Sequence, residues 1–178
     1  MNIETDRLLL RDINENDLNF IYEMDKSPLV YYYDEDIEPS KEDVFDRYKA
    51  RIENMKLNSD KHYIFLITLK NKGLPIGEVH ANLNWEALKE WELGFKLHPD
   101  FWGNGYASEA VKAVIKFLFE EIYVHKIVGF CNAKNEKSSK LMMNVGMKKD
   151  GILREGRLLR NEWCDEYIFS MLSKDYFA

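Results

Sequence analysis

The chain has 178 residues and a mass of 21.1 kDa, a length that suits one domain, because two complete cores would leave each unit with fewer than about 100 residues. Hydrophobic residues make up 46% of the chain and charged residues 31%, a balance that argues against wholesale disorder. The formal net charge of -6 argues against a main role in binding nucleic acid or anionic membranes, and it favours a cationic partner.

The first elements expected are a short strand and two helices. Three leucines at 8–10 predict the strand, and Asn16-Asp17 offer a cap to a helix that Ser27-Pro28 ends. Pro39-Ser40 begins the second helix. Its apolar positions share one face, and they are Val44, Tyr48, Ile52 and Met55.

Three β-rich runs follow and predict an antiparallel meander, because short polar turns separate them. They span Tyr63–Leu69, Ile76–Leu83 and Trp91–Leu97. In the third run four apolar residues alternate with three others, so Glu92, Gly94 and Lys96 are expected on the opposite side of the strand.

The second half of the chain alternates between helices and strands. A loop over 98–105 leads into an amphipathic helix that includes Val111–Ile122. Then come a strand, a short helix stopped by Gly146 and a closing strand, spanning Lys126–Cys131, Glu136–Asn144 and Trp163–Leu172. The order β-αα-βββ-αβ-αβ predicts an α+β fold, an α/β sandwich around a mixed sheet, in one domain over residues 1–178.

Neither a metal site nor a disulfide framework is expected. Cys131 and Cys164 form no CxxC pair, and the four histidines (His62, His80, His98 and His125) form no metal-binding motif, so the cysteines are expected to be core thiols and the histidines structural. The N-terminus lacks an apolar signal core, and no apolar run approaches the roughly 18 residues that span a bilayer. We therefore expect a cytoplasmic protein that is not embedded in a membrane.

The most informative segment lies between the third β-rich run and the long helix, and it reads Trp102-Gly103-Asn104-Gly105-Tyr106-Ala107. Small residues let backbone N–H groups approach a ligand closely, and the helix that follows offers unpaired donors and partial positive charge. This pattern predicts a pyrophosphate cradle, with a simple tight turn as the alternative. The lysine of a P-loop is missing, which disfavours nucleotide hydrolysis.

A second cluster lies downstream and contains Asn135-x-x-Ser138, then Val145-Gly146-Met147. With this cluster the chain resembles the GNAT superfamily of acetyl-CoA-dependent N-acetyltransferases, and in particular the branch of ribosomal-protein serine/alanine N-acetyltransferases and spermidine acetyltransferases. Each motif is weak alone, but their joint occurrence in family order over nearly the whole chain is a strong signal. The other matching segments are Thr5-Asp6-Arg7-Leu8-Leu9-Leu10-Arg11, Trp91-Glu92-Leu93-Gly94-Phe95 and Gly103-Asn104-Gly105-Tyr106-Ala107.

The resemblance implies a GNAT-like sheet, mostly antiparallel, with flanking helices and two parallel strands that splay apart to admit the pantetheine arm of acetyl-CoA. It implies no metal. Asn135 would bond the pantetheine or a bridging water and Ser138 would lie near the thioester sulfur, although this spacing also suits a helix-capping pair. The cofactor-binding residues implied are Phe95, Trp102, Gly103, Asn104, Gly105, Tyr106, Ala107, Asn135 and Ser138.

Two positions depart from the commonest family pattern. Trp102 stands where Gln or Arg is usual, so a side-chain contact to phosphate is lost while the backbone cradle can remain. Met142 stands where many members have the tyrosine that protonates the departing thiolate, so Ser138, another tyrosine or water must supply that proton. These departures keep a second hypothesis open, a CoA-binding module without turnover.

The reaction requires a proton acceptor, because exposing the lone pair of an alkylammonium at pH 7 costs about 4.6 kcal/mol. Glu92 is the candidate, on the polar side of its strand, and its alternative role is a solvated sheet residue. A backbone N–H near Phe95 or Lys96 would stabilise the oxyanion in this family. Direct attack by the amine needs no enzyme nucleophile, so the catalytic residues expected are Glu92 and Ser138.

The acceptor is expected to be a primary amine: a peptide N-terminus, a polyamine or another small amine. Residues 31–36, three tyrosines followed by three acidic residues, suit an ammonium group, or else the tyrosines pack and the acids are solvated. The substrate-binding residues expected are Tyr33, Trp85 and Glu92, with Glu86 beside them. We expect no nucleic-acid or membrane partner, and either a monomer or a homodimer.

Overall fold

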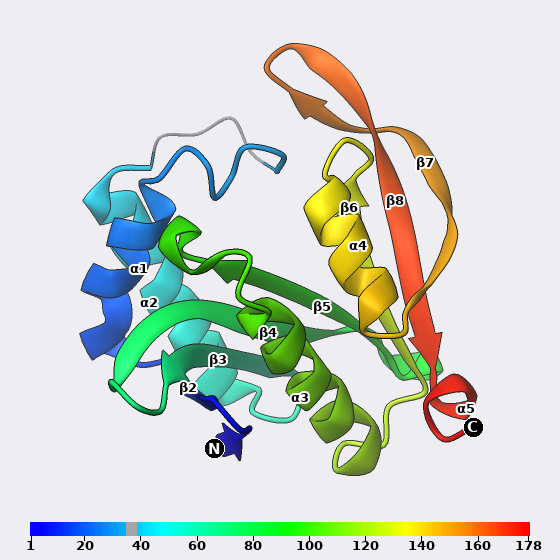
Figure 1. Ribbon diagram of the computed structural model, residues 1–178, viewed down its shortest axis with the longest axis horizontal. Coiled ribbons are helices and arrows are strands. Elements are labelled where there is room, and N and C mark those ends of the chain that lie inside the picture. The colour runs from blue at the N-terminus through cyan, green and yellow to red at the C-terminus, as the bar shows by residue number, and fades with distance from the viewer. Residues whose placement is uncertain (35–38) are drawn as a thin grey trace.

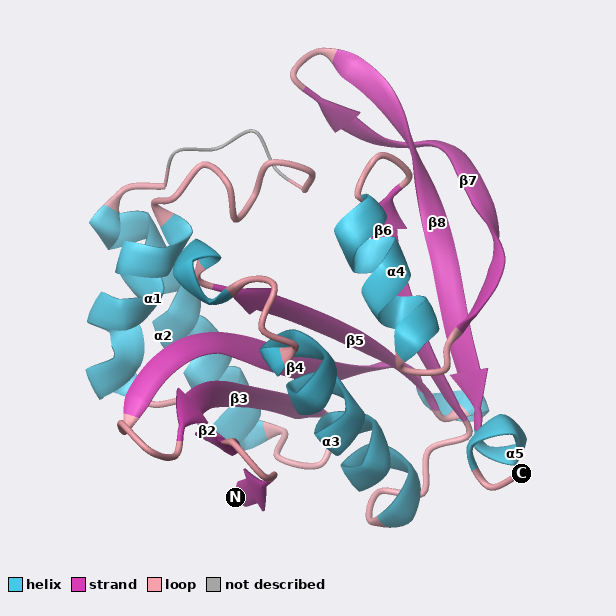
Figure 2. Ribbon diagram, in the orientation of Figure 1, coloured by secondary structure: helices cyan, strands magenta, loops and turns pink. Residues whose placement is uncertain are grey.

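The computed structural model describes residues 1–34 and 39–178. Figures 1 and 2 show its helices and strands, with one short 3₁₀ turn before α1, one before β5 and one before α3. In chain order the elements are β1 (Asn2–Glu4), β2 (Leu8–Asp12), α1 (Leu18–Asp25), α2 (Lys41–Leu57), β3 (His62–Leu69), β4 (Leu74–Trp85), β5 (Glu90–Leu97), α3 (Tyr106–Glu120), β6 (Lys126–Asn132), α4 (Glu136–Asn144), β7 (Lys148–Leu159), β8 (Glu162–Leu172) and α5 (Ser173–Tyr176).

Local sequence explains where the first two helices begin. Ser40 caps α2, and its hydroxyl accepts a bond from the Asp43 backbone N–H while the Asp43 carboxylate bonds back, which is a capping box. Asn14, rather than the Asn16-Asp17 pair predicted from sequence, caps the turn that leads into α1. Asp17 completes this cap by accepting the Asn14 backbone N–H at 2.9 Å, and it also accepts bonds from both terminal guanidinium nitrogens of Arg11, at 2.7 and 2.8 Å.

The described strands form one sheet in the order β1-β2-β3-β4-β5-β6-β8-β7. Every neighbouring pair is antiparallel except β5 and β6. These two pair over only three positions, from Glu90 opposite Lys126 to Glu92 opposite Val128, and then diverge (Figure 2). The expected α+β class, the mixed and mostly antiparallel sheet and the splayed parallel pair are confirmed.

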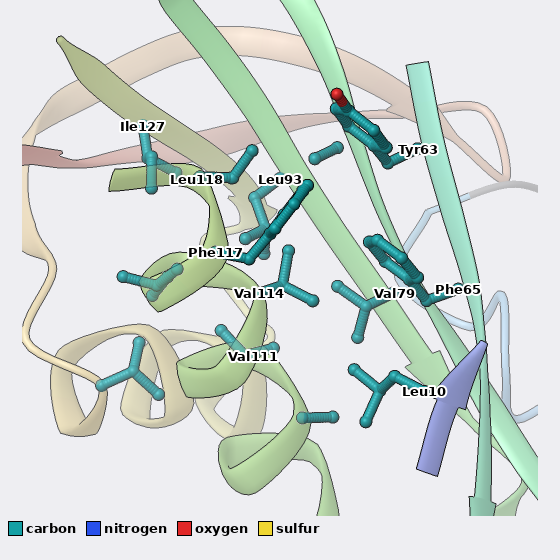
Figure 3. Packing of buried hydrophobic residues seen from close by; sticks show 14 of the residues in the cluster. Leu10, Tyr63, Phe65, Val79, Leu93, Val111, Val114, Phe117, Leu118 and Ile127 are labelled. Atoms are coloured by element: carbon teal, nitrogen blue, oxygen red, sulfur yellow. The ribbon is translucent and has the colours of Figure 1, made fainter. Parts of the chain in front are cut away.

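The larger core lies between the sheet and α3, and Figure 3 shows it from close by. Alternate residues of β3, including Tyr63 and Phe65, point toward α3 and meet Phe117 edge to face, with ring centroids 5.1 and 5.9 Å apart. Leu93 of β5 joins them from the same side of the sheet. The helix contributes the apolar face that its period predicts, namely Val111, Val114, Phe117 and Leu118.

A second core lies on the other face of the sheet, beneath α1 and α2. Ile64 and Leu66, the intervening residues of β3, pack there against Ile21 and Tyr48. Because β3 is buried on both faces, it reads as a nearly continuous apolar run. The sheet therefore separates an α3 face from an α1–α2 face, and this separation positions the candidate site.

The sequence did not predict two of the strands, β1 and β7. β1 has three residues, too few for a periodic signal. β7 is a twelve-residue edge strand, mostly exposed, with register shifts after Lys149 and after Leu153, so it has neither regular alternation nor an apolar run. Among the described residues, no helix is both long and apolar enough to cross a membrane.

Candidate active site

The glycine loop before α3 has the geometry of an anion cradle. Gly103 and Gly105 both have φ of 77°, a left-handed conformation that glycine adopts without strain. Gly105 is the N-cap of α3 and offers no side chain to the first turn, so the N–H groups of that turn are available to a ligand. A Cβ built at Gly103 meets no atom within 4 Å, so the loop surface is open there. These features fit a pyrophosphate group.

Two predicted cofactor residues shape this loop with their side chains. The indole N–H of Trp102 donates to the Leu97 carbonyl at 2.9 Å, which ties the loop to the end of β5. The amide of Asn104 donates to the carbonyls of Phe101 and Trp102, at 3.3 and 3.1 Å. Both polar groups are thus used within the loop, and the remaining donors toward a ligand are backbone N–H groups.

Sequence reasoning assigned no role to Arg7, which the structure places beside the cradle. Its guanidinium donates to Glu109 at 2.6 Å and to the Asn104 carbonyl at 3.0 Å, and it lies 4.5 Å from the Tyr106 ring centre. Burial opposes ionisation of Glu109, but bonds from Thr5 and Arg7 hold its pKa below the usual value. The Thr5-Asp6-Arg7 motif carried this signal, because it matches the family pattern.

A second cation lies on the other side of the loop. The ammonium group of Lys137, in the first turn of α4, lies 4.8 Å from the Trp102 ring centre. Arg7 and Lys137 together give the cradle positive charge within a chain whose net charge is -6.

The splay between β5 and β6 opens a gap in the sheet next to the cradle. Beyond Glu92, β5 pairs only with β4, through positions that include Val79 opposite Phe95. In an antiparallel pair every second N–H points away from the partner strand, so this part of β5 directs backbone donors into the gap. The Phe95 side chain packs on the α3 face, and the Lys96 side chain lies on the opposite face.

Asn135 and Ser138 lie on the β6 side of the gap. Asn135 caps α4, because its Oδ1 accepts the Ser138 backbone N–H at 3.1 Å. The side-chain oxygen of Asn135 therefore has the capping role, and its amide nitrogen can bond a ligand. Ser138 lies beside the Cys131 thiol, and burial, only partly offset by this neighbour, raises the pKa of Cys131 to about 11. At neutral pH Cys131 is a buried neutral thiol, which makes it a poor nucleophile.

Met142 is fully engaged in packing. A Cβ built at Gly129, the first β6 residue past the paired region, would lie 2.9 Å from the Met142 sulfur. Met142 therefore occupies the space against β6, and its thioether has no proton to donate.

On the face opposite α3, polar side chains of β4 and β5 form a row beside the gap, which we call the polar row. Cross-strand pairs place Glu78 opposite Lys96, His80 opposite Gly94 and Asn82 opposite Glu92. A Cβ at Gly94 would lie 2.5 Å from both Cε1 and Nε2 of His80, so the imidazole rests directly on this glycine. The row thus runs from Glu78, 1% exposed, to Glu92 at the start of the splay.

Glu78 anchors the buried end of the polar row. Tyr48 donates to it at 2.7 Å and Arg51 at 3.3 Å, both from α2. Burial opposes ionisation of Glu78, but Lys96, His80 and Arg51 hold its pKa well below the usual range. Burial, and then the same carboxylate, raise the pKa of Tyr48.

Lys96 links the polar row to α1 and the loop after it. Its ammonium group bonds Asp25 at 2.5 Å and the Tyr31 hydroxyl at 2.8 Å, and Arg47 bonds the other oxygen of Asp25 at 2.7 Å. Burial and the neighbouring Asp25 raise the pKa of Tyr31 well above its usual value. No sequence period marks this cluster, since Asp25 and Lys96 are 71 positions apart.

Comparison with known proteins decides the family. The model of the acetyltransferase (GNAT) domain matches residues 7–148. The chain belongs to the GNAT acetyltransferase family. An uncharacterized N-acetyltransferase, YnaD, from Bacillus subtilis (strain 168) is 28% identical over 176 residues, 99% of either chain. These matches confirm the expected enzyme class, an N-acetyltransferase.

Solved GNAT structures share the whole fold. The acetyltransferase (GNAT family) from Bacillus anthracis has a TM-score of 0.86 at 25% identity, covering 98% of this chain and 99% of its own. The ribosomal-protein α-N-acetyltransferase RimL, solved with coenzyme A, has a TM-score of 0.86 at 17% identity, with coverage of 97% and 98%. A spermidine N-acetyltransferase chimera from Vibrio cholerae and hSSAT has a TM-score of 0.84 at 21% identity, with coverage of 97% and 99%. The resemblance to this branch is confirmed.

The loop between α1 and α2 of this GNAT enzyme faces the β7–β8 hairpin at the open end of the splay (Figure 1). Arg157 donates to the Asp34 carbonyl at 2.7 Å and to Glu166 at 3.0 Å, and Arg160 donates to the Tyr32 carbonyl at 3.0 Å. Tyr33 stacks edge to face on Tyr32, 4.8 Å between ring centres. These bonds join the two halves of the splayed sheet across its open end.

The predicted acceptor residues are only partly brought together. Tyr31 packs in the buried cluster with Lys96, as the packing alternative supposed, whereas Tyr33 lies in the loop at the open end. Glu35 and Asp36 lie outside the described residues. Trp85 pairs with Glu90 at the closed end of the splay, apart from Tyr33, and Glu86 is ion-paired with Lys61 at 3.0 Å.

Proposed function

We propose that this protein transfers the acetyl group of acetyl-CoA to a primary amine by direct attack of the amine. One observation carries the proposal: the gap between β5 and β6 has a phosphate cradle on the α3 face and the polar row on the other. A cofactor held on one face can meet an amine that arrives from the other, through a sheet that would otherwise separate them.

We assign the cofactor site to the glycine loop, the start of α3 and the start of α4. The backbone of residues 102–107 and the first turn of α3 hold the pyrophosphate, with Arg7 and Lys137 adding charge. Asn135 donates its amide to the pantetheine arm. When bound, acetyl-CoA supplies an activated acyl group, and a β5 N–H near Phe95 or Lys96 stabilises the negative charge that develops on its carbonyl oxygen.

Glu92 has two roles in this proposal. It attracts the ammonium group of the acceptor, and it takes a proton from that group, directly or through a water chain. Its position suits both, since it lies opposite Val128 at the last paired position before the strands diverge. The amine lone pair is then free to attack.

The departing thiolate needs a proton, and we assign its delivery to Ser138. Met142 cannot donate one, and the Ser138 hydroxyl lies on the α3 face beside Cys131, on the β6 side of the gap. If Ser138 does not donate this proton, the phenol of Tyr167, the cross-strand neighbour of Cys131 on β8, would donate it.

The acceptor is proposed by class only. The solved relatives named above act on a ribosomal-protein N-terminus and on spermidine, according to their names, and both are primary amines. In this chain Arg157 pairs with Asp34 and with Glu166, so these two acids already have a cationic partner near the cleft. We therefore assign ammonium recognition to Glu92 rather than to the acidic loop.

The test is thiol release from acetyl-CoA with a panel of peptide N-termini, polyamines and small amines. We expect turnover with at least one class, and Glu92→Gln should lower kcat/KM about 100-fold or more and move the pH profile toward higher pH. Glu53→Gln, which removes the same charge from an exposed position on α2, is the control for electrostatic effects at a distance. Cofactor binding without transfer to any amine would instead support a CoA-binding module.

A further inference from the structure

We propose that His80 is the proton acceptor beyond Glu92, so that the proton leaving the amine passes along the polar row to the imidazole. This proposal rests on the proposed acetyl transfer and adds a residue to it. The sequence did not distinguish His80 from the other histidines, because the proposed role depends on the residues of β5 that lie opposite it.

The position of His80 is the first argument. It is on β4, opposite Gly94, and diagonal to Glu92 on the same face of the strand pair. Diagonal neighbours on an antiparallel pair lie roughly 7–8 Å apart, a distance that two long side chains or one bridging water can close. Gly94 is two residues past Glu92, so the Nε2 edge of the ring lies where β5 has already parted from β6.

The orientation of the ring is the second argument. Nδ1 is buried, lies 3.7 Å from Glu78 Oε1 and makes no hydrogen bond among the described residues. The ionised Glu78 favours a proton on Nδ1 rather than on Nε2 by simple attraction. The neutral ring then presents Nε2 as an acceptor, and its side chain is 26% exposed, so part of it can be reached.

The absence of a side chain at position 94 is the third argument. Because a Cβ there would overlap the imidazole, glycine is required wherever the ring keeps this position. His62, by contrast, lies one strand further from the gap and its Nδ1 is 3.1 Å from Asn82 Oδ1. Among the described histidines, only His80 combines a carboxylate near one nitrogen with a second nitrogen over Gly94, past the last position at which β5 pairs with β6.

The chemistry balances without another reagent. An alkylammonium gives one proton to Glu92 and from there to Nε2 of His80; the amine nitrogen forms its bond to the acetyl carbon as the carbon–sulfur bond breaks. The Ser138 hydroxyl gives its proton to the departing thiolate, and the second nitrogen proton, released as the amide forms, replaces it through solvent. His80 then returns its proton to solvent.

Other charged groups surround the imidazole and must be considered in any pH profile. They are Glu78 from β4, Glu92 and Lys96 from β5, Tyr48 and Arg51 from α2, and, through Lys96, Asp25 at the end of α1.

The experiment compares four enzymes in the thiol-release assay: wild type, His80→Gln, His80→Ala and His62→Ala. We expect both His80 variants to lose about 100-fold in kcat, with the KM for acetyl-CoA nearly unchanged, and to lose the part of the pH profile that depends on a neutral imidazole. Free imidazole in the buffer should restore much of the rate of His80→Ala, because the deletion leaves a ring-sized space beside Gly94. His62→Ala should keep its rate and gain nothing from imidazole.

Each outcome decides one question. If wild type transfers acetyl groups and folded His80 variants are within about threefold of it, or if their loss is the same at every pH and imidazole restores nothing, His80 has only a structural role. If wild type transfers to no amine, the proposed function itself fails. Gly94→Ala covers the case in which both His80 variants misfold: it should displace the ring and lower kcat, and full activity in this variant would overturn the proposal.

Discussion

At the scale of single residues, the cradle depends on Gly103, whose backbone is left-handed and whose α-carbon faces open space. We predict that Gly103→Ala raises the KM for acetyl-CoA about tenfold, because the new methyl group stands where a phosphate approaches the backbone. Stability should fall by only about 1 kcal/mol, the cost of a left-handed alanine. Steady-state kinetics and urea denaturation measure the two effects.

Gly73 provides the matched control. It has φ of 61° in the turn between β3 and β4, and a Cβ there also meets nothing within 4 Å. Gly73→Ala should therefore cost similar stability and leave the KM for acetyl-CoA unchanged. Equal changes in KM for the two variants would mean that backbone strain, and not phosphate approach, explains the Gly103 result.

Residues of the site differ in how far sequence could predict them. The glycines, Asn135 and Ser138 form local patterns, in which a few neighbouring positions carry the chemistry. His80 becomes informative only through the strand register, because its partner Gly94 lies 14 positions away on β5. Arg7 belongs to a matching motif, but its contact with Asn104, 97 positions away, comes from the fold. A residue whose role depends on a cross-strand neighbour has no signal in a local window.

At the scale of elements, the β7–β8 hairpin holds the loop after α1 through Arg157. We predict that Arg157→Ala raises the KM for the acceptor, leaves the KM for acetyl-CoA unchanged and lowers the free energy of unfolding by about 2 kcal/mol, because Glu166, 8% exposed, loses a charged partner. Arg154→Ala, an exposed position on the same strand, should change stability by less than about 0.5 kcal/mol. An unchanged acceptor KM in Arg157→Ala would remove the hairpin from acceptor binding.

The same hairpin shows why some elements were predicted and others missed. α4 was predicted with its observed bounds, and β5 to within one residue, because apolar periodicity and caps mark them. β7 gains its order from pairing with β8, over a register shifted by bulges, and such an edge strand needs no apolar alternation of its own. Its conformation therefore depends on tertiary contacts, and it is also the strand that bonds to the loop after α1.

At the scale of the whole molecule, the sheet keeps two chemistries apart. The α3 face carries the glycine loop, Arg7 and Lys137, which we propose for the cofactor, and the other face carries Glu78, His80 and Glu92, which we propose for the amine. The net charge of -6 therefore does not describe the glycine loop, where Lys137 and the Glu109-paired Arg7 lie beside the backbone donors. In the proposed mechanism, the two faces meet at the gap between β5 and β6.

Glu78, at the buried end of the polar row, also contributes to the stability of the fold. Its pKa in the folded state lies below the ordinary carboxyl value of about 4.3, so its contribution to stability is complete above that pH and is lost as pH falls toward the folded-state value. Glu78→Gln leaves Arg51 and Lys96 without this carboxylate and should lower the free energy of unfolding at pH 7 by about 3 kcal/mol.

Urea denaturation of both proteins from pH 7 to pH 3 checks the sign. The wild type should lose stability steeply below about pH 4.3, and the difference from Glu78→Gln should shrink over the same interval, because protonation removes in the wild type the charge that the substitution has already removed. Glu86→Gln, whose carboxylate is 75% exposed, should cost less than about 1 kcal/mol and leave the acid dependence as in wild type. Three neighbouring basic side chains hold Glu78 ionised, so protonation of this carboxylate must remove that interaction. Parallel pH curves for wild type and Glu78→Gln would therefore show that the acid sensitivity arises elsewhere in the molecule.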